Sequence, residues 1–136
     1  MNELLVALRT NIIADNTVRG LIDDRCYPAH IATLPTVSYP CACFAISGGS
    51  LDQDISDFGI IAINIWSWSE NHYEQAWEIY NAIFTVLDHN KLSATVDGIT
   101  VRAVLRETVR PIQAYDETSK VYFLMSTWEA RCLKTT

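Results

Sequence analysis

The chain has 136 residues, of which 49% are hydrophobic and 19% are charged, and its net charge is −6 at pH 7. This length fits one domain over residues 1–136, large enough to bury about two-thirds of its unfolded surface. The apolar content argues against disorder, and the acidic balance argues against a general nucleic-acid binder. No apolar run approaches the roughly 20 residues of a membrane span, and no basic start of a signal peptide is visible.

The N-terminal part is expected to be helical. Residues 2–15 carry Leu4, Leu5, Leu8 and Ile12 at the spacing of an apolar helix stripe. Thr17–Ile22 predicts a short second turn of helix.

Three prolines interrupt the next segment, Asp23–Pro40. Because proline lacks a backbone donor and presets φ, this segment is expected to be an ordered but irregular excursion. Two interpretations stay open for it: a contact arm, or a loop lying over one edge of the sheet.

The first strand is expected over Cys41–Ser47, and Gly48-Gly49-Ser50 is expected to end it. The following segment, Leu51–Asp57, carries three aspartates, and their spacing does not match an EF-hand. A solvated loop joining two antiparallel strands is therefore favoured over a cation or partner site.

The stretch Phe58–Leu87 combines a strand and a helix, and it forms the centre of the predicted fold. Residues 60–68 are dense in β-branched and aromatic residues, as in a strand covered on both faces. Asn71 and Glu74 fit a capping box that starts a helix. The helix places apolar residues on one stripe: Ala76, Ile79, Tyr80, Ile83, Phe84 and Leu87.

Two further strands are predicted in the C-terminal third. Residues 92–97 are expected to be a short connection, and Gly98–Val109 a strand that Pro111 stops. Residues 113–120 are expected to be a polar turn. Val121–Cys132 has large apolar residues on both faces, as in a central strand.

The predicted order is therefore α-β-β-α-β-β. We expect an α+β fold with a four-stranded, mainly antiparallel sheet and two helices packed on one face.

The alternation in Gly98–Val109 places Arg102, Arg106 and Arg110 on the face opposite the apolar one. Such a row could bind phosphate or carboxylate groups. A solvated sheet face is the somewhat favoured interpretation, because antiparallel sheets commonly expose one side.

No catalytic or cofactor-binding motif is present, so no enzyme activity and no cofactor are predicted. Cys41, Cys43 and His30 could in principle hold a metal ion in a small metal-dependent enzyme. Reduced, buried thiols are the better interpretation of these cysteines, because free cysteine is commonly buried.

Taken in order, these segments resemble the phage tail terminator or tail completion family over nearly the full chain. Cys26 and the Cys41–Cys43 pair depart from it, since apolar residues are expected there. The segments that carry the resemblance are Ala14-Asp15-Asn16, Val18, Leu21, Asp24-Arg25-Cys26-Tyr27-Pro28, Leu34-Pro35, Tyr39-Pro40, Ile63-Asn64-Ile65-Trp66-Ser67, Ala76, Ile79, Ile83, Val96-Asp97-Gly98-Ile99 and Val121-Tyr122-Phe123-Leu124-Met125.

The resemblance implies a virion structural protein of the tail and neck, assembled in the host cytoplasm. It implies a homo-hexameric ring that caps the tail tube, ends tail polymerisation and offers a surface for head–tail joining. Its partners would be other copies of itself, the tail tube protein and a head–tail connector or stopper protein. DNA would pass through the lumen without specific binding. The alternative within virions is another connector protein, a stopper or a minor tail protein.

The family has no catalytic motif to transfer, so interface residues are predicted from the chain itself. The Asp23–Pro40 and Gly48–Asp57 segments are the candidates for subunit and tube contacts, and the arginine row is the candidate partner of acidic loops on a neighbouring subunit. The predicted interface residues are Arg25, Tyr27, His30, Asp52, Asp54, Asp57, Arg102, Arg106 and Arg110.

Overall fold

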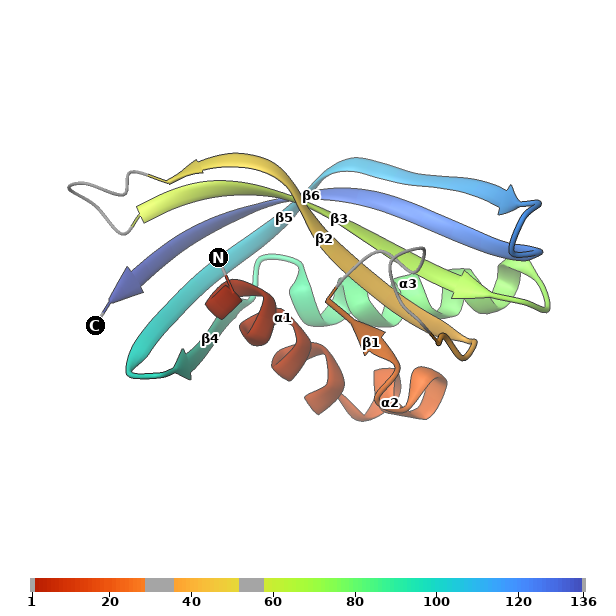
Figure 1. Ribbon diagram of the computed structural model, residues 1–136, viewed down its shortest axis with the longest axis horizontal. Coiled ribbons are helices and arrows are strands. Elements are labelled where there is room, and N and C mark those ends of the chain that lie inside the picture. The colour runs from red at the N-terminus through yellow and green to blue at the C-terminus, as the bar shows by residue number, and fades with distance from the viewer. Residues whose placement is uncertain (1, 29–35, 52–57, 136) are drawn as a thin grey trace.

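The computed structural model describes residues 2–28, 36–51 and 58–135. Within these ranges a curved six-stranded sheet forms one layer, and three helices form the other (Figure 1). The elements are α1 (Asn2–Ala14), α2 (Asn16–Ile22), β1 (Cys26–Tyr27), β2 (Cys41–Leu51), β3 (Phe58–Ser69), α3 (Tyr73–Leu87), β4 (Lys91–Val96), β5 (Ile99–Asp116) and β6 (Val121–Thr135).

The predicted four-stranded sheet with two helices is wrong. The strand order is β1-β2-β3-β6-β5-β4, and β1 runs parallel to β2 while the other neighbours are antiparallel. The two strands missed by the sequence analysis lie at the sheet edges. β1 has only two residues and lies in the proline-containing segment, and in β4 only Leu92 is buried. β1 is too short to be identified in a sequence, whereas β4 does alternate, with Leu92, Ala94 and Val96 on one face, and was mistaken for a connection.

The predicted strand ends were also wrong in two places. β2 continues through Gly48 to Leu51 by way of an irregularity between Ile46 and Gly48. β5 continues past Pro111 to Asp116, and its pairing with β6 shifts between Glu107 and Val109 and again between Val109 and Ile112. Proline is tolerated there because β5 is an irregular strand without a described neighbour on its other side.

Several other predictions are confirmed. The second short helix is present as α2, and the last strand, β6, is central because it pairs with both β3 and β5. Asp97 and Gly98 form a turn, each with positive φ, and this turn joins β4 to β5 as a hairpin. The cap of α3 differs from the prediction: His72 Nδ1, and not Asn71, accepts the Gln75 backbone N–H at 3.1 Å.

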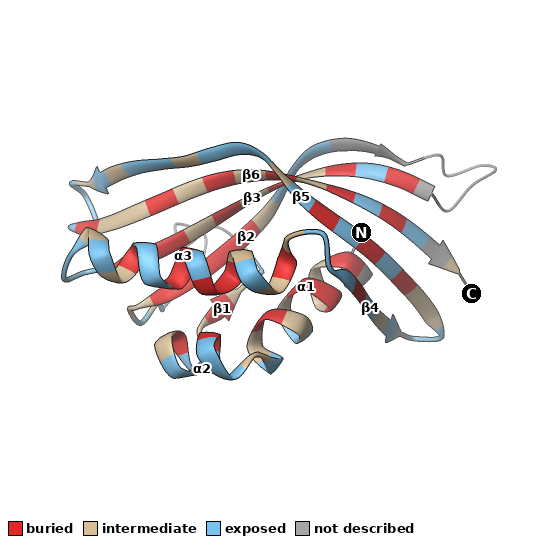
Figure 2. Ribbon diagram, turned by 180° about the vertical axis from the view of Figure 1, so that it is seen from behind, coloured by how far each residue is buried: buried red, intermediate tan, exposed pale blue. Residues whose placement is uncertain are grey.

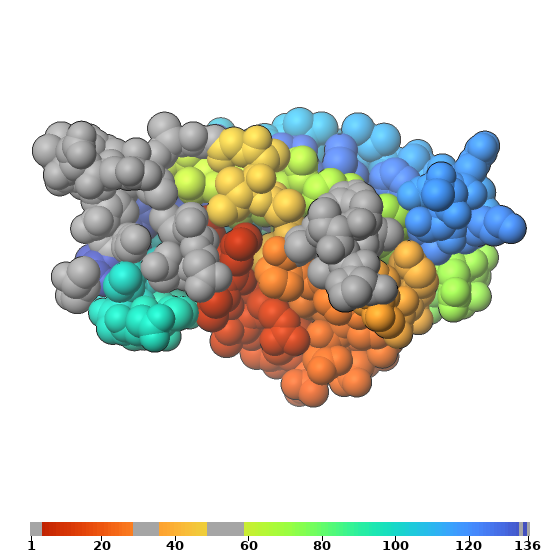
Figure 3. Space-filling model, viewed as in Figure 1, coloured from red at the N-terminus to blue at the C-terminus, as the bar shows by residue number. Residues whose placement is uncertain are grey.

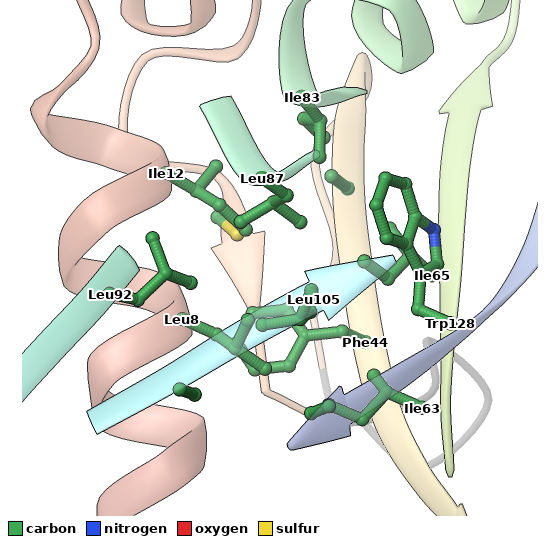
Figure 4. Close-up of a cluster of buried hydrophobic side chains, with 14 of the residues drawn as sticks. Leu8, Ile12, Phe44, Ile63, Ile65, Ile83, Leu87, Leu92, Leu105 and Trp128 are labelled. Carbon is green, nitrogen blue, oxygen red and sulfur yellow. The ribbon is translucent and has the colours of Figure 1, made fainter. Parts of the chain in front are cut away.

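The core lies between the helices and the sheet. Period-two alternation turns one face of each long strand towards the helices, where apolar side chains from all layers meet (Figure 4). None of the helices in the described ranges is long and apolar enough to cross a membrane. The central side chains of this core are Leu8, Ile12, Phe44, Ile63, Ile65, Ile83, Leu87, Leu92, Leu105 and Trp128.

Neighbouring residues of β5 provide a matched test of this arrangement. Leu105 is fully buried, whereas Val104 points to the opposite face and is 37% exposed. Leu105→Ala should lower the free energy of unfolding by roughly 2–5 kcal/mol, because it leaves a cavity in the core. Val104→Ala should cost less than about 1 kcal/mol. Urea denaturation of both variants measures the difference, and equal costs would contradict the assigned faces.

Candidate interaction surface

The face of the sheet opposite the helices, here called the outer face, carries a concentration of positive charge at its β6–β5–β4 end. Strand pairing brings Arg102 beside Leu133, Arg106 beside Glu129, and Val104 between Lys91 and Arg131. We call the four cations Lys91, Arg102, Arg106 and Arg131 the basic surface. They are four of the ten lysines and arginines of an acidic chain. Lys91, Arg102 and Arg131 contribute to the lining of a hollow of about 460 Å³.

Glu129 lies between two of these arginines. Its carboxylate oxygens lie 3.2 Å from Arg131 Nε and 3.5 Å from Arg106 Nη2. The hydrogen bond from Arg131, followed by the charge of Arg106, lowers the pKa of Glu129. One carboxylate thus faces two guanidinium groups, and both arginine side chains remain more than half exposed. The surface can therefore bind a further carboxylate or phosphate group.

The predicted row of three arginines is not continuous. The two shifts in β5 pairing fall between Arg106 and Arg110 and break the alternation. As a result, Arg110 lines a hollow beside α3 with Trp77 and Asn81, and it shares a further hollow with Arg106. The sequence showed three arginines at even spacing and carried no signal for the bulges.

The rim of this second hollow was not identified by the sequence analysis. Tyr80 Oη donates a hydrogen bond to Glu107, and Trp77 Nε1 donates to Gln113 Oε1 at 2.9 Å. Burial, followed by the hydrogen bond to Glu107, raises the pKa of Tyr80. These contacts hold α3 against β5, while Trp77 itself remains 36% exposed.

Arg25 and Tyr27 lie at the other edge of the sheet from the basic surface. Arg25 Nε donates to the Pro40 carbonyl at 2.8 Å, and Tyr27 in β1 packs against the buried outer-face cluster that contains Cys41 and Cys43. These contacts therefore hold residues 25–27 against β2 and the Pro40 carbonyl that precedes it. The remaining predicted interface residues, His30, Asp52, Asp54 and Asp57, lie outside the described residues.

All four cysteines are buried as thiols. Cys41 and Cys43 point to the same face, as predicted, and Trp68 Nε1 donates to Cys43 Sγ at 3.2 Å. Burial raises the pKa of Cys26 to about 12 and that of Cys132 to about 11, and it also raises the pKa of Cys41. In the ranges that the structure describes, no three His, Cys, Asp or Glu side chains are grouped so that they could hold a metal ion.

The fold of this chain is also found in a known protein, although its sequence matches no described family. No protein-family model and no curated protein matches the sequence. A solved structure does match: a chain in the virion of a native gene transfer agent (GTA) particle. The similarity has a TM-score of 0.70 at 15% sequence identity, and it covers 96% of this chain and 95% of that chain. The two chains therefore share their fold over nearly their whole lengths.

The buried thiols give a direct chemical prediction. Because the thiolate is the reactive species, a pKa of about 11 leaves roughly one in a thousand Cys132 groups ionised at pH 8. The folded protein should therefore react at none of its four cysteines with a thiol reagent such as DTNB at pH 8. The urea-denatured protein should react at all four. Rapid reaction of the native protein would contradict this burial.

Proposed function

We propose that this chain is a virion structural protein that caps the tail tube of a long-tailed phage or prophage particle as a hexameric ring. In that role it ends tail polymerisation and forms the surface for head–tail joining, with DNA passing through the lumen. The observation that carries the proposal is the fold similarity to a virion chain over 96% of this chain. The resemblance of the sequence to tail terminators supports the more specific role.

The surface of the protein supports an assembly role better than a catalytic one. Seven of the eight exposed large hydrophobic side chains among the described residues lie on strands of the sheet, which are surfaces that other proteins can cover. The proposal is therefore that the chain is not an enzyme. Its partners would be further copies of itself, the tail tube protein and a connector or stopper protein.

Two sets of charged residues are proposed to meet between subunits. Arg102 and Arg106 of the basic surface would pair with aspartates of a neighbouring subunit, for which Asp52, Asp54 and Asp57 are the candidates in the sequence. Arg110, Arg25, Tyr27 and His30 remain proposed contacts with the tube or with other subunits. A second candidate function, a stopper or minor tail protein, would use the same fold against the connector.

The proposed role predicts selective binding to tail tubes. Purified protein mixed with tubes and viewed by negative-stain electron microscopy should cap the tube ends, and it should sediment with tubes in preference to tail-less heads. Bare tube ends together with binding to heads would support the stopper instead. Binding to neither would contradict the proposal.

One substitution tests the contribution of the basic surface. Arg106→Glu should reduce tube capping at least about tenfold, because it replaces the proposed attraction to the aspartates of a neighbouring subunit by repulsion. Lys120→Glu makes the same change of charge at an exposed position in the turn between β5 and β6, and it should cap normally. Equal capping by both variants would remove Arg106 from the interface.

A further inference from the structure

Two long stretches of strand lack a neighbour among the described residues. On the open side of β5, the last described backbone hydrogen bond is the one from His89 N to the Leu105 carbonyl at 2.9 Å, so the backbone of residues 106–116 forms an edge without a described neighbouring strand. At the opposite end of the strand order, β1 pairs with β2 only at Ala42 and Cys43, so residues 44–51 form a second free edge. Both stretches contain irregular pairing, and in β5 the register becomes regular again over residues 112–116, after Pro111, which has no N–H to donate.

These two edges also carry exposed apolar side chains. The described residues include eight large hydrophobic side chains that are exposed, and four of them lie on the free edges. They are Ile46 on β2, 37% exposed, and Val109, Ile112 and Tyr115 on β5, which are 49%, 51% and 43% exposed. Figure 2 shows the second half of β5 exposed along most of its length. Unpaired backbone groups beside apolar side chains are a template for a further strand.

We infer that the partner of the β5 edge is the β2 edge of a second copy of this chain. This inference rests on the ring assembly in the proposed function. β2, β3, β6 and β5 are antiparallel in succession, so β2 and β5 run in opposite directions. Copies arranged head to tail with the same orientation would therefore pair β5 of one with β2 of the next as antiparallel strands, and the sheet would continue from subunit to subunit.

Charge supports the same direction of pairing. Antiparallel alignment brings the Leu51 end of the neighbouring β2 towards the Arg106 end of the free β5 edge, next to the basic surface. The sequence that follows Leu51 contains three aspartates within six residues, 52–57. The opposite charges would favour this orientation and would disfavour the reverse one.

Two kinds of contact between copies could use these edges. In Figure 3 the turn between β5 and β6 lies at one end of the molecule, and the turn between β4 and β5 lies towards the other. A two-fold dimer in which β5 pairs with β5 would leave both β2 edges unpaired. A single head-to-tail contact satisfies both edges of every copy, and such a contact closes into a ring when the rotation allows.

The test uses two single variants, each of which introduces a lysine on one of the two edges. Ile112→Lys blocks the β5 edge, and Ile46→Lys blocks the β2 edge. Ile60→Lys is the matched control, since Ile60 is a 42% exposed isoleucine on β3, which is paired on both sides. Light scattering on a sizing column at high concentration should give an assembly larger than a dimer for the wild type and for Ile60→Lys. Each edge variant alone should be a monomer.

Mixing the two edge variants gives the decisive result. Each retains one intact edge, so the mixture should form a heterodimer and nothing larger. If β5 instead pairs with itself, Ile46→Lys alone would still form dimers, and this would overturn the inference. A monomeric wild type, or assembly by both edge variants, would also overturn it. None of these outcomes decides whether the protein caps tail tubes. The microscopy experiment tests that role separately.

Hydrogen exchange tests the same edges without any substitution, in case a variant fails to fold. Amides within residues 44–51 and 106–116 should exchange at least about tenfold more slowly in the assembled wild type than in diluted protein. Unchanged exchange at both edges in the assembled protein would overturn the pairing.

Discussion

The alternation of side chains along β3, β5 and β6 is the constraint on which the rest of the structure depends. It turns Ile63, Leu105 and Trp128 towards the helices, where all three are buried. A shift of one residue in the pairing would reverse the faces and expose this core to water, so the register is strongly specified. The same alternation leaves the opposite face of the sheet without a helical cover. The core therefore also determines which side chains are available to partners.

The irregular pairing of β5 divides that available surface into two regions. Before the bulges, Arg106 lies with Glu129 and Arg131 on the outer face. After them, Arg110 lies beside α3, and Val109 and Ile112 are exposed along an edge without a described neighbour. A charged region that favours one orientation thus adjoins an apolar strand edge that can hold a neighbour. This combination suits a protein that assembles, since charge contributes specificity while apolar burial contributes affinity.

The similarity to a virion chain concerns fold and not composition. At 15% identity the two chains share few residues, yet the match extends over 96% of this chain. A two-layer fold is kept by the pattern of apolar positions more than by particular residues. The surfaces and strand edges, in contrast, are not fixed by that pattern, so two chains can share this fold and present different groups to their partners.

The sequence by itself determined the elements with strong periodicity: both long helices, the short α2, the buried face of β5 and the central position of β6. Patterns of this kind are local, so a single chain segment contains them completely. The place of β1 in the sheet could be seen only in the folded protein, because its two residues carry no strand pattern and pair with β2 across the proline-containing segment. β4 differs, since it forms a local hairpin with β5 and its alternation of Leu92, Ala94 and Val96 is present in the sequence. The folded sheet also places Arg106 against Glu129 and Arg110 in the hollow beside α3, because a bulge is a property of the pairing between two strands and not of either strand alone.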